Sequence, residues 1–136
     1  MTKNTGKDAE RAFTLRIKTD PLTVIERFWD QSDLRGLNGG RAVGDFPKPS
    51  DFIVTQHNKI FYAEVKSVQG SVSFPFSNIK RGQSSAALRQ AAVDGDYRFY
   101  IFSYGLGQWF VMPCDVYAWA LEQGQSSIKF KELPQW

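Results

Sequence analysis

The chain has 136 residues, of which 42% are hydrophobic and 15% aromatic, and its formal net charge is +3. This length and composition predict a single domain, residues 1–136, with a hydrophobic core of its own. A single cysteine and a single histidine exclude an internal disulfide and the usual zinc cage of nitrogen and sulfur ligands. The sequence shows no signal peptide and no apolar run long enough to span a bilayer, so we expect a cytoplasmic protein without a membrane partner.

Helical signals come first along the chain. Apolar residues recur at helical spacing over residues 7–18, which predicts a helix. A second, short helix is predicted over residues 21–29, because Asp20 can cap it and Pro21 suits its first position. After a glycine-rich turn region, residues 41–45 are expected to form a short strand.

A β-hairpin is the next predicted element. Residues 51–56 and 60–68 are rich in β-branched and aromatic side chains, and the polar segment His57-Asn58-Lys59 separates them. Asparagine tolerates the positive φ angles of a tight hairpin turn. If His57 and Asn58 form the turn, Gln56 lies opposite Lys59.

This register brings three charged side chains together. Counting back along both strands places Asp51 opposite Glu64, and the two-residue period of a strand puts Lys66 on the face of Glu64. Two carboxylates at this separation repel each other unless a cation lies between them. We therefore predict that Asp51 and Glu64 bind a divalent metal. Oxygen ligands favour Mg²⁺ or Mn²⁺, for which water and a substrate phosphate complete the octahedron.

Metal-assisted phosphodiester hydrolysis is the reaction that such a site predicts. The metal would lower the pKa of a bound water and stabilise charge on the scissile phosphate, and Lys66 could hold that water or offset that charge. The alternative interpretation is a half-exposed hairpin whose polar residues are only solvated. Apolar residues on both faces of the two strands count against this alternative, since unpaired charges there would be costly.

The second half of the chain alternates helical and β signals. We expect Cys114 to be a small buried side chain rather than a nucleophile. The tail, residues 128–136, could pair as an edge strand or mediate a dimer contact. The predicted elements are a helix from Gln83 to about residue 93, strands over residues 98–103 and 108–112, and a helix that Asp115 caps and that reaches about residue 123.

Five segments carry a family resemblance. They are Gly6-Lys-Asp-Ala-Glu10-Arg-Ala-Phe13, Asp51 with Glu64-Val65-Lys66, Phe74-Pro75-Phe76-Ser77-Asn78, Gln83, and the run from Tyr97 to Tyr104. In this order they resemble the PD-(D/E)XK nucleases and, among these, the RecU-type Holliday-junction resolvases. In this chain Ser50 separates Pro49 from Asp51, which displaces the proline by one residue from the name-giving motif. Residues 33–48 are short for the protruding stalk of RecU-type enzymes, which would fit a phage-encoded enzyme.

The resemblance implies a fold, a catalytic set and an assembly. The fold would be α/β, a restriction-endonuclease-like core in which helices flank a mixed central sheet in the order αβββαβ. Glu10 would be the upstream acidic residue of the site, and Gln83 the glutamine that opens the next core helix. The assembly would be a homodimer acting on four-way junctions in double-stranded DNA. The implied catalytic residues are Glu10, Asp51, Glu64, Lys66 and Gln83.

Basic residues flank these motifs. They can contact DNA phosphates on either side of a cut, although an exposed lysine or arginine is often only solvated. For Lys80 and Arg81, which lie beside Gln83, we favour binding. The predicted DNA-binding residues are Lys7, Arg11, Arg35, Arg41, Lys48, Lys80 and Arg81.

Two classes of function remain open at this point. The first is a Mg²⁺-dependent endonuclease that resolves branched DNA by paired nicks, with a repair endonuclease or nickase acting on flaps or mismatches as its nearest variant. The second is a DNA-binding module of the same fold that does not cut. The set of Glu10, Asp51, Glu64 and Lys66 favours the enzyme, because a module that only binds has no physical reason to keep two apposed carboxylates.

Overall fold

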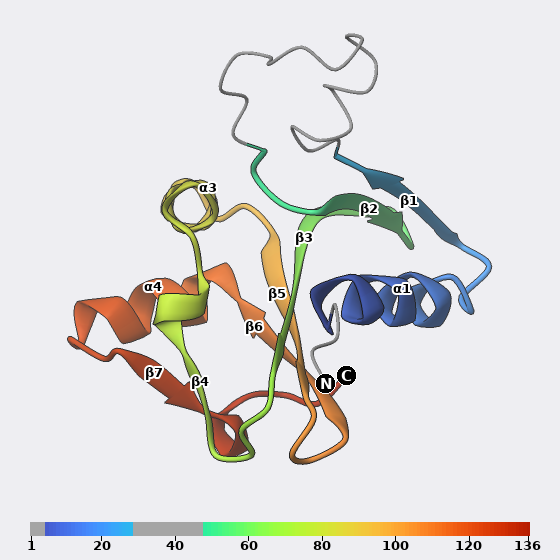
Figure 1. The fold of residues 1–136 in the computed structure, drawn as a ribbon. Helices are drawn as coiled ribbons and strands as arrows, with labels where there is room; N and C mark the ends of the chain where they lie inside the picture. Colours follow the sequence, from blue (N-terminus) through green and yellow to red (C-terminus); the bar gives the residue numbers. More distant parts are fainter. Residues whose placement is uncertain (1–4, 29–47) are drawn as a thin grey trace, which may run out of the picture.

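The computed structural model describes residues 5–28 and 48–136 (Figure 1). Its centre is a five-stranded mixed sheet with the strand order β1-β2-β3-β5-β6. Neighbouring strands run antiparallel except for β3 and β5, which run parallel and are joined by a crossover that contains helix α3. The strands are β1 (Thr23–Arg27), β2 (Phe52–Gln56), β3 (Lys59–Val68), β5 (Tyr97–Ser103) and β6 (Gln108–Pro113).

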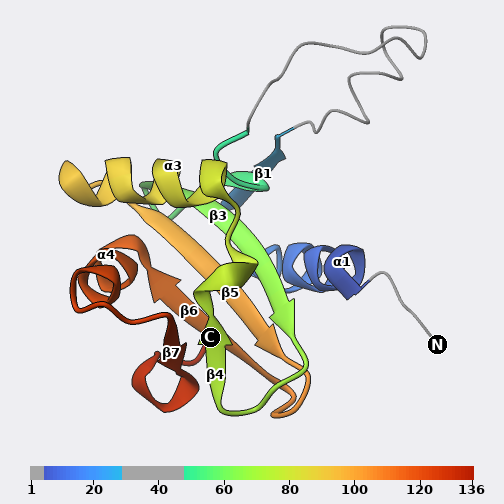
Figure 2. The same cartoon turned by 60° about the vertical axis from the view of Figure 1, so that its left-hand side comes forward.

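Helices cover both faces of this sheet (Figures 1 and 2). Helix α1 (Thr5–Ile17) lies against one face, and helices α3 (Arg81–Ala92) and α4 (Cys114–Glu122) lie on the other. A small two-stranded sheet of β4 (Ser73–Pro75) and β7 (Ser127–Lys129) lies below α4 in these views. Within the described residues, none of the helices combines the length and the apolar character that crossing a membrane requires.

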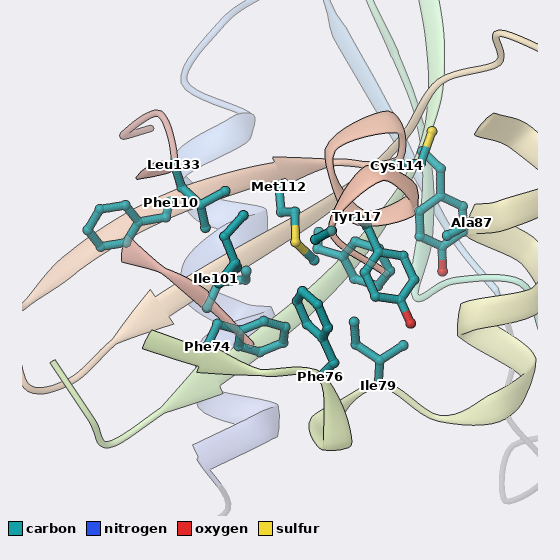
Figure 3. Packing of buried hydrophobic residues seen from close by; sticks show 14 of the residues in the cluster. Phe74, Phe76, Ile79, Ala87, Ile101, Phe110, Met112, Cys114, Tyr117 and Leu133 are labelled. Atoms are coloured by element: carbon teal, nitrogen blue, oxygen red, sulfur yellow. The ribbon is translucent and has the colours of Figure 1, made fainter. Parts of the chain in front are cut away.

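Each face of the sheet has its own hydrophobic core. On the α1 side, Phe13 packs among the aromatic rings of β2, β5 and β6, because alternate residues of each strand point to the same face. On the other side, Phe74, Ile101, Met112 and Tyr117 are among the buried residues that join the small sheet, the central sheet and α4 (Figure 3). Strands with apolar residues on both faces are typical of the centre of a covered sheet.

The predicted hairpin is confirmed, with its register. His57 and Asn58 are the two turn residues, and both have positive φ angles, 50° and 68°, which a tight turn between right-twisted strands requires. Gln56 pairs with Lys59, and the ladder continues to Phe52 and Ala63. The two-residue turn therefore determines which side chains of β2 and β3 share a face.

The helix predicted over residues 21–29 is wrong, because β1 occupies Thr23–Arg27. This strand pairs antiparallel with β2 and forms the edge of the sheet. Asp20 caps a turn instead of a helix: its carboxylate accepts the backbone N–H of Leu22 at 3.0 Å and contacts the ring of His57. Pairing with a distant strand outweighs the local helical signals of Asp20 and Pro21. The strand predicted over residues 41–45 lies outside the described residues.

The later elements follow the predicted order, but both helices begin earlier than expected, and α3 begins at Arg81 instead of Gln83. The helix expected to begin at Asp115 begins at Cys114 with Pro113 as its N-cap residue, so Asp115 lies in the first turn and does not cap. Cys114 is buried, as expected of a small core side chain. The tail pairs through β7 with β4 in the small sheet, and Gln135 forms a further bridge with Phe110. Apart from β4 of the small sheet, the described order α1, β1, β2, β3, α3, β5 matches the predicted αβββαβ, with β1 and not residues 41–45 as the described first strand.

Trp136 connects the tail to the α1 core. Its ring lies 5.3 Å from the ring of Phe13 and 4.8 Å from that of Tyr100, and the guanidinium of Arg16 lies 4.4 Å above it. We expect Trp136→Ala to lower the free energy of unfolding by about 2 kcal/mol, because the ring is only partly buried. Urea denaturation measures this loss. The control is Gln135→Ala at the exposed neighbouring residue, which is expected to change the free energy of unfolding by under about 0.5 kcal/mol. Equal stability of both variants would contradict the packing role.

Candidate active site

Asp51 and Glu64 face each other at the start of the β2–β3 hairpin. Asp51 directly precedes β2, and the hairpin register continued by one residue places it opposite Glu64. Its Oδ2 accepts a hydrogen bond from the backbone N–H of Val65 at 2.9 Å. The two residues are only 6% and 2% exposed, so both carboxylates lie in a largely water-excluded site. The structure therefore brings together the two acidic residues that the sequence predicts to be metal ligands.

Lys66 and Gln83 complete a hydrogen-bonded group with Glu64. The Nζ of Lys66 lies 3.4 Å from Glu64 Oε2 and donates to Gln83 Oε1 at 2.8 Å. Gln83 Nε2 donates to Glu64 Oε2 at 2.8 Å, and its Oε1 also accepts the backbone N–H of Lys80 at 3.0 Å. A glutamine side chain from α3 thus holds the charged groups of β3 in one arrangement.

Glu64 is the most electrostatically perturbed carboxyl of the site. Its Oε1 is buried and has no hydrogen-bond partner. Burial, and then the negative charge of Asp51, raise the pKa of Glu64 to about 8, although Lys66 and Lys48 act in the opposite direction. Lys48 reaches the site through an ion pair with Asp51, with Nζ and Oδ1 3.3 Å apart. The carboxylate of Glu64 is therefore short of positive charge and of hydrogen-bond donors.

Glu10 lies on α1, beside these groups. Its Oε1 forms an ion pair with Arg27 Nη1 at 3.1 Å. Burial, and then the charge of Asp51, raise the pKa of Glu10, so the two carboxylates are close enough to repel each other. Sequence reasoning missed Arg27, because the segment that carries it was predicted to be a helix and not the edge strand β1.

The donor set at this site fits a divalent cation of the magnesium class. Asp51 and Glu64 supply hard oxygen ligands, and the unpartnered Glu64 Oε1 is a buried acceptor that a cation would satisfy. In the part of the chain that the structure describes, no three His, Cys, Asp or Glu side chains form a cluster arranged to hold a metal ion. Magnesium commonly takes only one or two protein carboxylates and completes its shell with water and substrate phosphate, so two ligands suffice.

The predicted DNA-binding residues separate into two groups. Lys48, Lys80 and Arg81 lie on the carboxylate side, at the approach to β2 and the beginning of α3. Lys7 and Arg11 lie on α1, where they line a cleft together with Glu10, and Arg11 also pairs with Asp8 at 3.7 Å. Arg35, Arg41 and the stalk-region residues 33–47 lie outside the described residues.

Tyr97 was expected only as the beginning of a strand, and its contact beside the carboxylates was not predicted from the sequence. Its hydroxyl donates a hydrogen bond to the carbonyl of Pro49, and so ties the beginning of β5 to the segment that carries Asp51. Burial, and then the charges of Glu64 and Asp51, raise the pKa of Tyr97, which keeps the hydroxyl protonated as a donor. Ser50, fully buried, donates from Oγ to the carbonyl of Phe52 at 2.8 Å. These contacts fix the backbone around Asp51.

Comparison with known proteins gives a match among solved structures but none among family models or curated proteins. No protein-family model matches the sequence, and no curated protein matches it. Among solved structures, the 1.6 Å structure of Hjc from Archaeoglobus fulgidus, a Holliday junction resolvase from an archaeal hyperthermophile, is similar with a TM-score of 0.61 and 12% sequence identity. The match covers 96% of this chain and 95% of that chain. The predicted fold class, α/β with a restriction-endonuclease-like core around a mixed sheet, is thereby confirmed.

Proposed function

We propose that this protein is a metal-dependent DNA endonuclease that cuts branched DNA. The observation that supports the proposal most directly is the apposition of Asp51 and Glu64, both buried, with Lys66 on the same strand face. Nothing in the packing of the hairpin requires two carboxylates at this point, and bringing them together there costs free energy through burial and repulsion. A reaction that needs a cation and a phosphate between them accounts for that cost.

Each residue of the group has a role in this proposal. Asp51 and Glu64 would hold Mg²⁺ or Mn²⁺, which when bound supplies an activated water and stabilises charge on the scissile phosphate. Lys66 orients the attacking water and offsets the negative charge of the phosphate. Gln83 holds the side chains of Lys66 and Glu64 in position through hydrogen bonds, and Glu10 adds a third acidic group on the α1 side.

The substrate proposal rests on the structural neighbour and on symmetry. The Archaeoglobus protein with the similar fold is a Holliday junction resolvase. A four-way junction has two equivalent strands to cut, and a homodimer with two-fold symmetry would present one active site to each. We therefore propose the four-way junction as the preferred substrate and the homodimer as the active form. A RecU-type relationship and a phage origin stay predictions.

The test compares three DNA substrates made from the same sequences: a labelled four-way junction, a flap and a linear duplex. Each is incubated with the protein in Mg²⁺, in Mn²⁺ and in EDTA. Paired nicks in the junction alone, lost in EDTA, are the expected result. Equal cutting of flaps or duplex would replace junction resolution with a general repair endonuclease or nickase. Binding without cutting in either metal would instead identify a non-cleaving DNA-binding module.

Gln83→Ala tests whether the amide of Gln83 positions the charged groups. We expect the cleavage rate to fall by about ten- to a hundredfold with little change in DNA affinity, because Lys66 and Glu64 lose their shared partner. The acid limb of the pH–rate profile should move to higher pH, since the carboxylate of Glu64 loses a hydrogen-bond donor that favours its charged form. Gln123→Ala, an exposed glutamine at the end of α4, is the control. An unchanged pH profile in Gln83→Ala would show that Gln83 has no positioning role.

A further inference from the structure

A cleft of about 700 Å³ lies beside the carboxylates, between α3 and the segment that leads into β2. Tyr62 of β3 and Tyr97 of β5 line its strand side, and Lys48 lies at the approach to β2. The α3 side carries Arg81 and Arg89, and among the described residues that line the cleft there is no Asp or Glu. The cleft therefore has the charge of an anion-binding surface.

The polar side chains of α3 are arranged along the length of this cleft. Arg81, Ser85 and Arg89 follow one another at intervals of four residues, which places them on one face of the helix, and all three are exposed. Eight residues of helix span about 12 Å. The two guanidinium groups therefore form an extended line of positive charge along α3, which we call the track, and not a single charged point.

Arg81 and Arg89 differ from the other arginines that the structure describes. Arg11, Arg27 and Arg98 each form an ion pair with a carboxylate, and Arg16 lies over the ring of Trp136. Within the described residues, Arg81 and Arg89 have no such partner. Their charges are available to an external anion, and a guanidinium suits phosphate because its donors form a planar fork.

The cleft is continuous with the candidate active site. Lys48 lines the cleft and also pairs with Asp51, while Arg81 precedes Gln83 by two residues on the same helix. Arg89 lies six residues beyond Gln83, a distance of about 9 Å along the helix axis. Neighbouring phosphates of one DNA strand lie roughly twice as far apart as the axial rise of about 3.4 Å, because the backbone winds around the axis, so this distance corresponds to about one or two nucleotides.

We propose that this cleft holds the sugar–phosphate backbone of the DNA strand that leaves the active site, and that Arg89 binds a phosphate about one or two nucleotides from the cut. Arg81 binds a phosphate closer to the cut, and Ser85 lies between the two arginines. The inference rests on the proposed function in one respect, the placement of the scissile phosphate at Asp51 and Glu64. Binding of the backbone by the arginines is measurable without cleavage.

The first experiment measures the affinity of the protein for a four-way junction in EDTA as a function of salt concentration. Each phosphate contact that is lost lowers the slope of log affinity against log salt by about one. We expect Arg89→Ala to weaken binding about three- to tenfold and to lower the slope by about one, and Arg81→Ala with Arg89→Ala to lower it by about two. The control is Lys131→Ala, which removes an exposed positive charge from the tail and should leave the slope unchanged.

A second experiment locates the phosphate. Single phosphates around the cut are replaced by uncharged methylphosphonates, one position at a time. One position, about one or two nucleotides from the cut, should weaken binding by the native protein but not by Arg89→Ala.

The outcomes separate this inference from the proposed function. If the native protein cuts DNA but Arg89→Ala keeps the native affinity and salt slope, the cleft is not the backbone track and the nuclease proposal stands. If no metal supports cleavage but Arg89→Ala lowers the slope, the track exists and the nuclease proposal fails. Absence of DNA binding by the native protein would overturn both.

Discussion

Asp51→Asn is expected to lower the rate of junction cleavage by on the order of a thousandfold and to leave DNA affinity in EDTA the same or slightly tighter. Asparagine has the shape of aspartate, and its carbonyl oxygen can still accept the backbone N–H of Val65. The change removes the negative charge that faces Glu64 and that pairs with Lys48. In the proposed mechanism metal binding needs that charge, whereas DNA binding would depend on the basic residues and would be opposed by it.

The control for this prediction is Asp115→Asn, which neutralises an exposed carboxylate in the first turn of α4. It should cut junctions at the native rate. Urea denaturation of both variants shows whether a loss of activity follows from unfolding. Full activity of a folded Asp51→Asn variant would remove Asp51, and with it the proposed metal site, from the mechanism.

The second large effect concerns the stability of the metal-free protein as a function of pH. The pKa of Glu64 is raised from 4.5 to about 8, so between these values the folded protein keeps a proton that the unfolded chain has released. The contribution of Glu64 to stability is therefore fully present below pH 4.5 and is lost as the pH rises to about 8. Each pKa unit corresponds to about 1.4 kcal/mol, so we expect a loss of a few kcal/mol.

Glu64→Gln isolates this effect, because glutamine has the shape of the protonated carboxyl but does not titrate. The two proteins should be similarly stable near pH 4.5, and the variant should become the more stable one as the pH approaches 8. Groups that titrate in both proteins, Asp20 among them, cancel in the difference. The measurement is urea denaturation in EDTA across this range, with Glu122→Gln at an exposed position of α4 as the control. A parallel pH dependence in native protein and Glu64→Gln would refute the buried, destabilised carboxylate.

Metal addition gives the reciprocal result. If the proposed site is right, Mg²⁺ or Mn²⁺ will bind the ionised carboxylate in the folded state only, so it should restore part of the stability of the native protein near pH 8. Glu64→Gln should gain much less. Stability and cleavage would then be two separate assays of the proposed role of one side chain, that of Glu64.

The turn type and the alternation of side chains along a strand were enough to predict which hairpin residues of the candidate site lie side by side. The two-residue turn at His57 and Asn58 sets the register, and the alternation of side chains along a strand then places Asp51, Glu64 and Lys66 on one face. All of these residues lie within one hairpin, so no distant part of the chain is needed to bring them together.

Contacts between distant segments were beyond the reach of the sequence. Residues 21–29 carry a helix-capping aspartate and a proline, yet β1 forms because β2, some thirty residues later, offers an edge to pair with. Gln83 was expected at the start of α3, but only the packing of α3 against the sheet decides that its amide reaches both Glu64 and Lys66.

The same distinction applies to the residues that sequence reasoning missed. No local pattern marks Arg27 or Arg89, and Tyr97 was noted only as the beginning of a strand; each acquires its place through a partner far along the chain or through a cleft between elements. The sequence by itself determined that Asp51, Glu64 and Lys66 lie together, because hairpin geometry is local. The tertiary structure alone decided which side chains contact these carboxylates and where the cleft of the proposed DNA backbone lies, because those contacts form only when α1, α3 and the sheet are packed together.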